Sequence, residues 1–166
     1  LIRMQKGDTS GAIEDFSCAL QLDPRLTSAY TNRGMAKHDA GDLGGAIEDL
    51  TTAIQLDPKS AIAYCNRGTV RHDAGDLEGA IEDTSRALQL DPKSAVYHNN
   101  RGVYRLNLGD LGGAIEDLTA AIQLDPKSAE AYGNRGNAKN QKGDLGGAIE
   151  DLTTAVQLDP QSADAF

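Results

Sequence analysis

Apolar side chains recur at intervals of three and four residues between positions 43 and 56. They are Leu43, Ala46, Ile47, Leu50, Ala53 and Ile54. This spacing places them on one side of a helix, so the pattern predicts an amphipathic helix over 43–56. Asp42 is a favourable N-cap, and Asp57 precedes Pro58, which disfavours helical backbone. Sequence signals therefore mark both ends of this helix.

A second helix is predicted immediately before it, over 27–40. This segment holds good helix formers, and its small and aromatic residues fall toward one side: Ala29, Tyr30, Gly34 and Ala36. Gly41 then offers a left-handed C-terminal cap, and Ser60 is placed to cap the next helix. The 34 residues from 27 to 60 thus predict a pair of helices joined by a tight turn.

The same pattern returns every 34 residues. The triplet Asn-Arg-Gly ends at Gly34, Gly68, Gly102 and Gly136, and all five prolines share one phase of the period. A fixed period of this length indicates an all-α solenoid of stacked units, because one unit alone buries too little apolar surface. We expect one array over 1–166 and interpret it as a fragment. It divides into a partial repeat 1–26, full repeats 27–60, 61–94, 95–128 and 129–162, and a stub 163–166.

Two kinds of contact between helices follow from the register. Gly34 is expected to face Ala46, because small residues at fixed phase allow two helices to approach closely. The arginine of each triplet is expected to pair with a carboxylate of a Glu-Asp dipeptide such as Glu48-Asp49, either within its own unit or in the neighbouring one. The alternative is exposed charge that contributes at most about 1 kcal/mol.

Composition excludes several classes of function. The formal net charge is −9 and the isoelectric point is near 4.7, which disfavours a nucleic-acid partner. No apolar run is long enough to span a membrane. Cys18 and Cys65 are expected to be free thiols, which favours a reducing, cytoplasmic location. The chain contains no Gly-x-Ser-x-Gly, no P-loop and no His-Glu-x-x-His, so we predict neither an enzyme nor a cofactor.

The repeat resembles a known family. Its characteristic positions are occupied in the first full unit by Tyr30, Gly34, Gly41, Ala46, Leu50, Ala53 and Pro58. The chain resembles the tetratricopeptide repeat (TPR) family along its whole length, although Lys37 stands where that family has a tyrosine. The resemblance implies a right-handed superhelix of antiparallel helix pairs. It also implies a non-catalytic protein-interaction scaffold whose first helices line a concave groove for partner peptides.

Carried onto this sequence, the resemblance gives a candidate peptide-binding groove. Its residues are Thr31, Asn32, Met35, His38, Ile62, Cys65, Asn66, Thr69, His72, Val96, Asn99, Asn100, Val103, Leu106, Asn134 and Asn137. The triplet asparagines form a ladder of amides that is able to hold a peptide backbone. The alternative is that these amides hydrogen-bond within the array. No lysine stands at Thr31, Cys65, Asn99 or Gly133, so we predict no clamp for a chaperone carboxylate.

Three departures interrupt the repeat. The third unit reads Tyr97-His98 where the others read Ala-Tyr, and we expect His98 to be packed. Thr84 occupies a leucine register, which is expected to weaken packing, and Leu26 replaces a capping serine.

The dipeptides His38-Asp39 and His72-Asp73 are one repeat apart. They suggest either a metal site of two imidazoles and two carboxylates or a polar surface duplicated with the repeat. Repetition explains them fully, so no metal is predicted.

Two other functions are compatible with the sequence. The first is a structural array that self-associates end to end through Leu152, Val156 and Phe166. The second is a docking arm of a larger enzyme.

Overall fold

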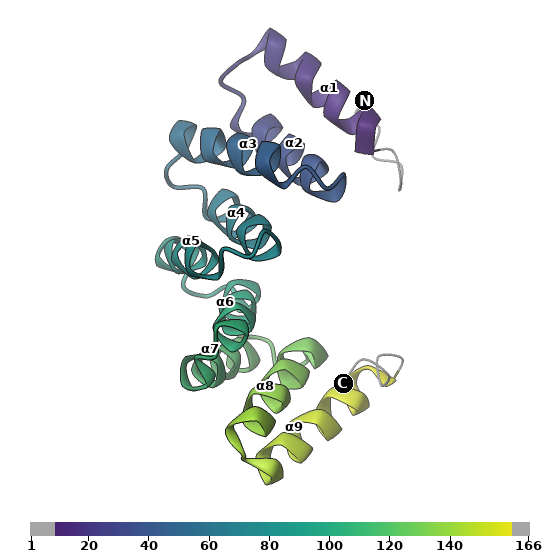
Figure 1. Ribbon diagram of the computed structural model, residues 1–166, viewed down its shortest axis with the longest axis vertical. Helices are drawn as coiled ribbons and strands as arrows, with labels where there is room; N and C mark the ends of the chain where they lie inside the picture. Colours follow the sequence, from purple (N-terminus) through teal and green to yellow (C-terminus); the bar gives the residue numbers. More distant parts are fainter. Residues whose placement is uncertain (1–8, 161–166) are drawn as a thin grey trace. The chain divides into compact units, whose positions relative to one another are not determined.

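The computed structural model describes residues 9–160, and in that range every regular element is an α-helix (Figure 1). The nine helices are α1 (Thr9–Leu22), α2 (Thr27–Asp39), α3 (Leu43–Leu56), α4 (Ala61–Asp73), α5 (Leu77–Leu90), α6 (Ala95–Leu108), α7 (Leu111–Leu124), α8 (Ala129–Lys142) and α9 (Leu145–Leu158). The prediction of an all-α fold is confirmed. None of these helices is long and apolar enough to cross a membrane.

The helices form two compact units, Leu1–Leu90 and Asp91–Phe166. In the first unit, each helix from α1 to α5 packs against the next, and α2 also contacts α4. The second unit repeats the arrangement, with each helix from α6 to α9 packed on the next and α6 in contact with α8. Each repeat is therefore a hairpin of two helices, α2 with α3 and α8 with α9 among them (Figure 1).

Helix ends follow the predicted signals closely. The carboxylate of Asp42 accepts a hydrogen bond from the Gly45 amide at 2.9 Å, and Ser60 Oγ accepts one from the Ala63 amide at 3.3 Å. Gly41 has φ of 84°, the left-handed conformation expected of a C-terminal cap. Leu26 has no side-chain hydrogen-bond acceptor, and α2 accordingly begins at Thr27 without a side-chain cap. The sequence thus fixes both where the helices end and which cap is missing.

Close packing of small residues holds each hairpin together. A Cβ added at Gly34 would lie 2.9 Å from Leu50 Cγ and 3.2 Å from the carbonyl oxygen of Ala46. The predicted approach of Gly34 to Ala46 is therefore confirmed. In the second repeat, Thr84 takes the leucine register and is fully buried, and its hydroxyl donates to the Ala80 carbonyl at 2.8 Å.

A buried ion pair joins the two helices of every repeat. Arg33 donates through Nε and Nη2 to both carboxylate oxygens of Asp49, each at 2.7 Å. The equivalent pairs are Arg67–Asp83, Arg101–Asp117 and Arg135–Asp151. The predicted pairing is confirmed, with aspartate rather than glutamate as the acceptor, and each aspartate is at most 4% exposed.

The same arginines also reach the preceding hairpin. Arg33 Nη1 donates to Ser17 Oγ at 3.1 Å, and Arg67 Nη1 donates to Thr51 Oγ1 at 3.0 Å. One guanidinium therefore links three consecutive helices. Burial opposes ionisation of Asp49, but hydrogen bonds from Arg33 and Lys37 outweigh it and hold the pKa of Asp49 below its usual value.

Candidate functional site

A cavity of about 320 Å³ lies between α2 and α4 in the first unit. Three residues of the predicted groove line it together, namely Thr31 and Asn32 from α2 and Ile62 from α4. Its other lining residues are Thr27, Ser28, Asp57 and Ser60. The first helices of two successive repeats thus line one shared depression.

The chemistry of this cavity is mixed. Ile62 is 57% exposed, a large apolar side chain left open to solvent. Within the described residues the side-chain amide of Asn32 makes no hydrogen bond, so both its donor and its acceptor face outward. Thr31, by contrast, donates its hydroxyl to the Thr27 carbonyl at 3.1 Å and is mostly buried. An apolar contact beside a free amide suits one side chain and the adjoining backbone of a peptide.

Other predicted groove residues of the first unit lie deeper. Cys65 is buried, and Met35 packs against the core formed by Ala46, Leu50 and Val70. Thr69 donates to the Cys65 carbonyl at 3.2 Å. The surface that these three residues offer to a ligand is therefore small.

The two histidines of the first unit meet at a single carboxylate. His38 Nε2 of α2 lies 2.7 Å from Asp73 Oδ2 of α4, and His72 Nδ1 lies 2.9 Å from Asp73 Oδ1. Burial works against ionisation of Asp73, but the two imidazole contacts outweigh it and lower the pKa of Asp73. Nowhere in residues 9–160 do three His, Cys, Asp or Glu side chains form a group able to hold a metal ion. The cluster is a polar link between α2 and α4.

The second unit uses its amides internally. Asn134 Nδ2 donates to Asn99 Oδ1 at 3.1 Å, and Asn99 Nδ2 donates to Glu130 Oε1 at 2.9 Å. For Asn134 this is the alternative interpretation of the asparagine ladder, in which the amide bonds within the array. Val96 remains 62% exposed on the first turn of α6.

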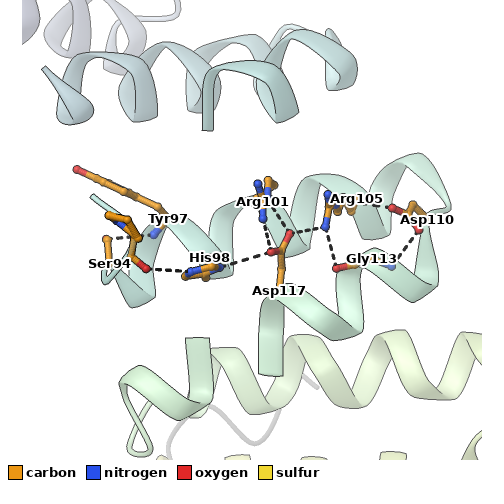
Figure 2. Close-up of polar contacts among 9 residues, drawn as sticks. Ser94, Tyr97, His98, Arg101, Arg105, Asp110, Gly113 and Asp117 are labelled. Atoms are coloured by element: carbon orange, nitrogen blue, oxygen red, sulfur yellow. Dashed lines mark hydrogen bonds and ion pairs between the residues drawn. The ribbon is translucent and has the colours of Figure 1, made fainter. Parts of the chain in front are cut away.

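Figure 2 shows the departure in the third repeat, where a histidine replaces the usual tyrosine. His98 Nδ1 lies 3.4 Å from Asp117 Oδ1, and His98 Nε2 lies 3.3 Å from the Pro92 carbonyl oxygen. Arg101 and Arg105 occupy the remaining positions around the same carboxylate, at 2.7 and 2.9 Å. His98 is half-buried, in line with the expectation that it is packed, and its imidazole contacts the carboxylate of the Arg101–Asp117 pair.

The remaining groove candidates of the second unit differ in exposure. Leu106 packs against the core of Ala114, Leu118 and Ala138. Val103, Asn100 and Asn137 are half-buried on α6 and α8. Asn66, of the first unit, is also half-buried.

The predicted self-association residues fall on α9. Val156 is 36% exposed, whereas the side chains at its register in the other hairpins, Ile54, Leu88 and Ile122, are at most 9% exposed. Ile149, one helical turn before Leu152, is 66% exposed, and Leu152 is half-buried. Phe166 lies outside the described residues.

Comparison with known proteins agrees with this architecture. A TPR repeat model matches residues 34–75, and two tetratricopeptide repeat models match 61–94 and 99–163. The chain belongs to the tetratricopeptide repeat family. A search of curated proteins finds no match.

Solved structures share the fold over nearly the whole chain. A crystal structure of MamA is 28% identical, with a TM-score of 0.85 over 95% of this chain and 92% of that one. MamA from Desulfovibrio magneticus RS-1 is 19% identical, with a TM-score of 0.85 over 93% of this chain and 87% of that one. YrrB, described as a TPR protein with an unusual peptide-binding site, is 23% identical, with a TM-score of 0.78 over 93% and 79%. The fold is therefore that of a TPR solenoid, and the likeness supports a protein-interaction scaffold in general terms.

Proposed function

We propose that the protein is a non-catalytic scaffold that binds a peptide segment on the first helices of its repeats. The cavity between α2 and α4 is the observation that carries the proposal, since it joins Thr31, Asn32 and Ile62 from two successive repeats. A volume of about 320 Å³ suits one or two side chains of an extended peptide better than a cofactor. The partner is a protein rather than a nucleic acid, because the chain carries a net charge of −9. Free Cys18 and Cys65 favour a cytoplasmic location.

Ile62 is proposed as the apolar anchor and Asn32 as the backbone contact. An exposed isoleucine in a depression gains by covering apolar surface, and an unpaired amide is able to donate to and accept from a peptide bond. Anchors of this kind typically carry most of the binding free energy of an interface.

Selection of displayed peptides against the whole chain tests the proposal. Peptides that bind should lose at least about tenfold in affinity when Ile62→Asp is introduced, because the anchor is replaced by a charge. Leu22→Asp is the matched control: Leu22 is 89% exposed on α1 and lies outside the cavity. Failure to select any peptide, or equal affinities for Ile62→Asp and the parent, would overturn the proposal.

A second candidate function is self-association through α9. Val156 is 36% exposed, whereas Ile54 and Ile122 at the same register pack with Ala63 and Ala131 of the following helix, and this exposed apolar side chain supports a second copy of this chain as the occupant. Sedimentation of the parent and of a Leu152→Asp, Val156→Asp variant tests it. A concentration-dependent dimer that the variant abolishes is the expected result, and a strict monomer at high micromolar concentration would argue against it.

A further inference from the structure

A second, larger cavity lies between α4 and α5 in the first unit, with a volume of about 540 Å³. Tyr64, Arg67 and Arg71 line it from α4, on the opposite side of that helix from Ile62, since nine residues at about 100° each separate Ile62 from Arg71 by half a turn. The cavity is therefore distinct from the peptide site proposed above.

Three arginines and two carboxylates surround this cavity: Arg67, Arg71, Arg86, Glu82 and Asp83. Two of these arginines, Arg67 and Arg71, pair with the same carboxylate, that of Asp83. Arg67 holds both oxygens of Asp83 at 2.7 and 2.8 Å, and Arg71 Nη1 lies 3.0 Å from Asp83 Oδ2.

Arg86 is different. Its Nη1 donates to the neutral amide oxygen of Gln89 at 2.7 Å, and within residues 9–160 it forms no ion pair. It is exposed at the rim of the cavity, so its remaining N–H groups are open to a ligand. Arg67 and Arg71 both pair with Asp83, and Arg71 Nε also lies 3.7 Å from Asp76 Oδ2. Arg86 is therefore the arginine of the cavity lining that has no carboxylate partner in residues 9–160.

The other full repeats lack an arginine at this register. The register of Arg86 holds Thr52, Ala120 and Thr154 in the first, third and fourth full repeats. In the first repeat Arg33 and Lys37 are balanced by Glu48 and Asp49. The unpaired arginine is thus specific to the second full repeat of a chain that is acidic overall.

We propose that this cavity binds one carboxylate group of a peptide or protein ligand. A guanidinium recognises a planar oxyanion through two parallel hydrogen bonds, and Arg86 has the free donors for it. A monoanion matches the one unpaired guanidinium of Arg86, whereas a phosphate dianion would bring further negative charge close to Glu82. Carboxylate is therefore preferred to phosphate.

Titration of the whole chain, followed through its arginine side-chain Nε–Hε resonances by NMR, tests the proposal. N-acetylglutamate N-methylamide represents a side-chain carboxylate and N-acetylalanine a C-terminal one, and the tighter of the two identifies the source. At least one should produce saturable shifts of the Arg86 resonance, while the corresponding glutamine and alanine amides should not. Equal shifts with the amides, or phosphate binding as tightly as either acid, would overturn the proposal.

The repeat provides its own controls for this titration. Arg86→Thr, which installs the residue of the first and fourth repeats, should weaken binding at least about tenfold. Adding Thr52→Arg to the Arg86→Thr variant should restore carboxylate binding, now in the first full repeat, because Gln55 stands at the register of Gln89. The Nε–Hε resonance of Arg33 would report this binding. Unchanged affinity in Arg86→Thr would overturn the proposal, and so would a failure of Thr52→Arg to transfer the site.

Discussion

Removal of the Asp49 carboxylate is the sharpest test of how each hairpin is held together. Asp49 is 4% exposed and accepts two hydrogen bonds from Arg33 and one contact from Lys37 at 2.9 Å. The substitution Asp49→Ala would remove the only carboxylate that either cation pairs with among the described residues, leaving Arg33 with Ser17 Oγ and Lys37 with the Gly45 carbonyl. The expected result is a large loss of stability without loss of helical structure at neutral pH.

The magnitude follows from burial. Removing one partner of a buried ion pair costs about 3–5 kcal/mol, because the other charge stays desolvated. Here the side chains of Arg33 and Lys37 are 18% and 20% exposed, so both can turn partly toward water. We therefore expect Asp49→Ala to lower the free energy of unfolding by about 2–3 kcal/mol.

Urea unfolding followed by far-ultraviolet circular dichroism measures this loss. Glu48→Ala is the matched control, since Glu48 is an exposed acid one residue away and its removal should change stability by at most about 0.5 kcal/mol. The double variant Arg33→Met, Asp49→Leu should recover much of the loss, because it removes both charges and keeps the volume. Equal midpoints for Asp49→Ala and Glu48→Ala would refute the argument that the pair is a buried structural link.

Three further predictions concern packing, capping and acid. Gly136→Ala should destabilise by about 1–3 kcal/mol, because its Cβ would meet Leu152 Cγ at 2.8 Å, while Gly146→Ala, with nothing within 4 Å, should stabilise by about 0.5–1 kcal/mol; urea midpoints of the two variants check this pair. Leu26→Ser should raise the thermal midpoint, since an N-cap hydroxyl contributes about 1 kcal/mol to a helix that now lacks one. Burial of Asp151 is outweighed by hydrogen bonds from its basic partners, which lower its pKa. The contribution of Asp151 is therefore present above the pKa of an unfolded aspartate, about 4, and is lost as the pH falls through the lowered value. Asp151→Asn should consequently reduce the change in urea midpoint between about pH 7 and about pH 3.

Much of the fold could be predicted from the period alone. Leu43 and Leu56 were expected as helix ends and are the ends of α3, because proline and capping signals fix local backbone without help from distant residues. The arginine pairing was also predictable. Even the choice of Asp49 over Glu48 carried a signal: Asp49 lies three residues from Ala46 and next to Leu50 on the buried stripe, whereas Glu48 lies off it.

The candidate sites were less predictable, for physical reasons. Proximity of His38 and His72 follows from the period, but their shared use of Asp73 depends on side-chain rotamers that the sequence does not specify. Asn134 donates a hydrogen bond to Asn99. A side-chain amide pairs equally well with another amide or with a peptide backbone, so its residue type does not determine which partner it has. Distances across two helices decide such cases, and a one-dimensional pattern does not contain them.

Repetition also separates what the fold requires from what it merely tolerates. The buried arginine–aspartate pair appears in every full repeat, so its geometry is a requirement of the hairpin. Ile62 and Arg86 occur at registers filled in other repeats by serine or threonine among other residues, and both side chains are exposed at the edge of a cavity. Packing does not explain why Ile62 and Arg86 stand at these positions, because the other repeats have the same fold with different residues there. Exposed departures of this kind, rather than the repeated positions, are therefore where ligand recognition in this protein is best sought.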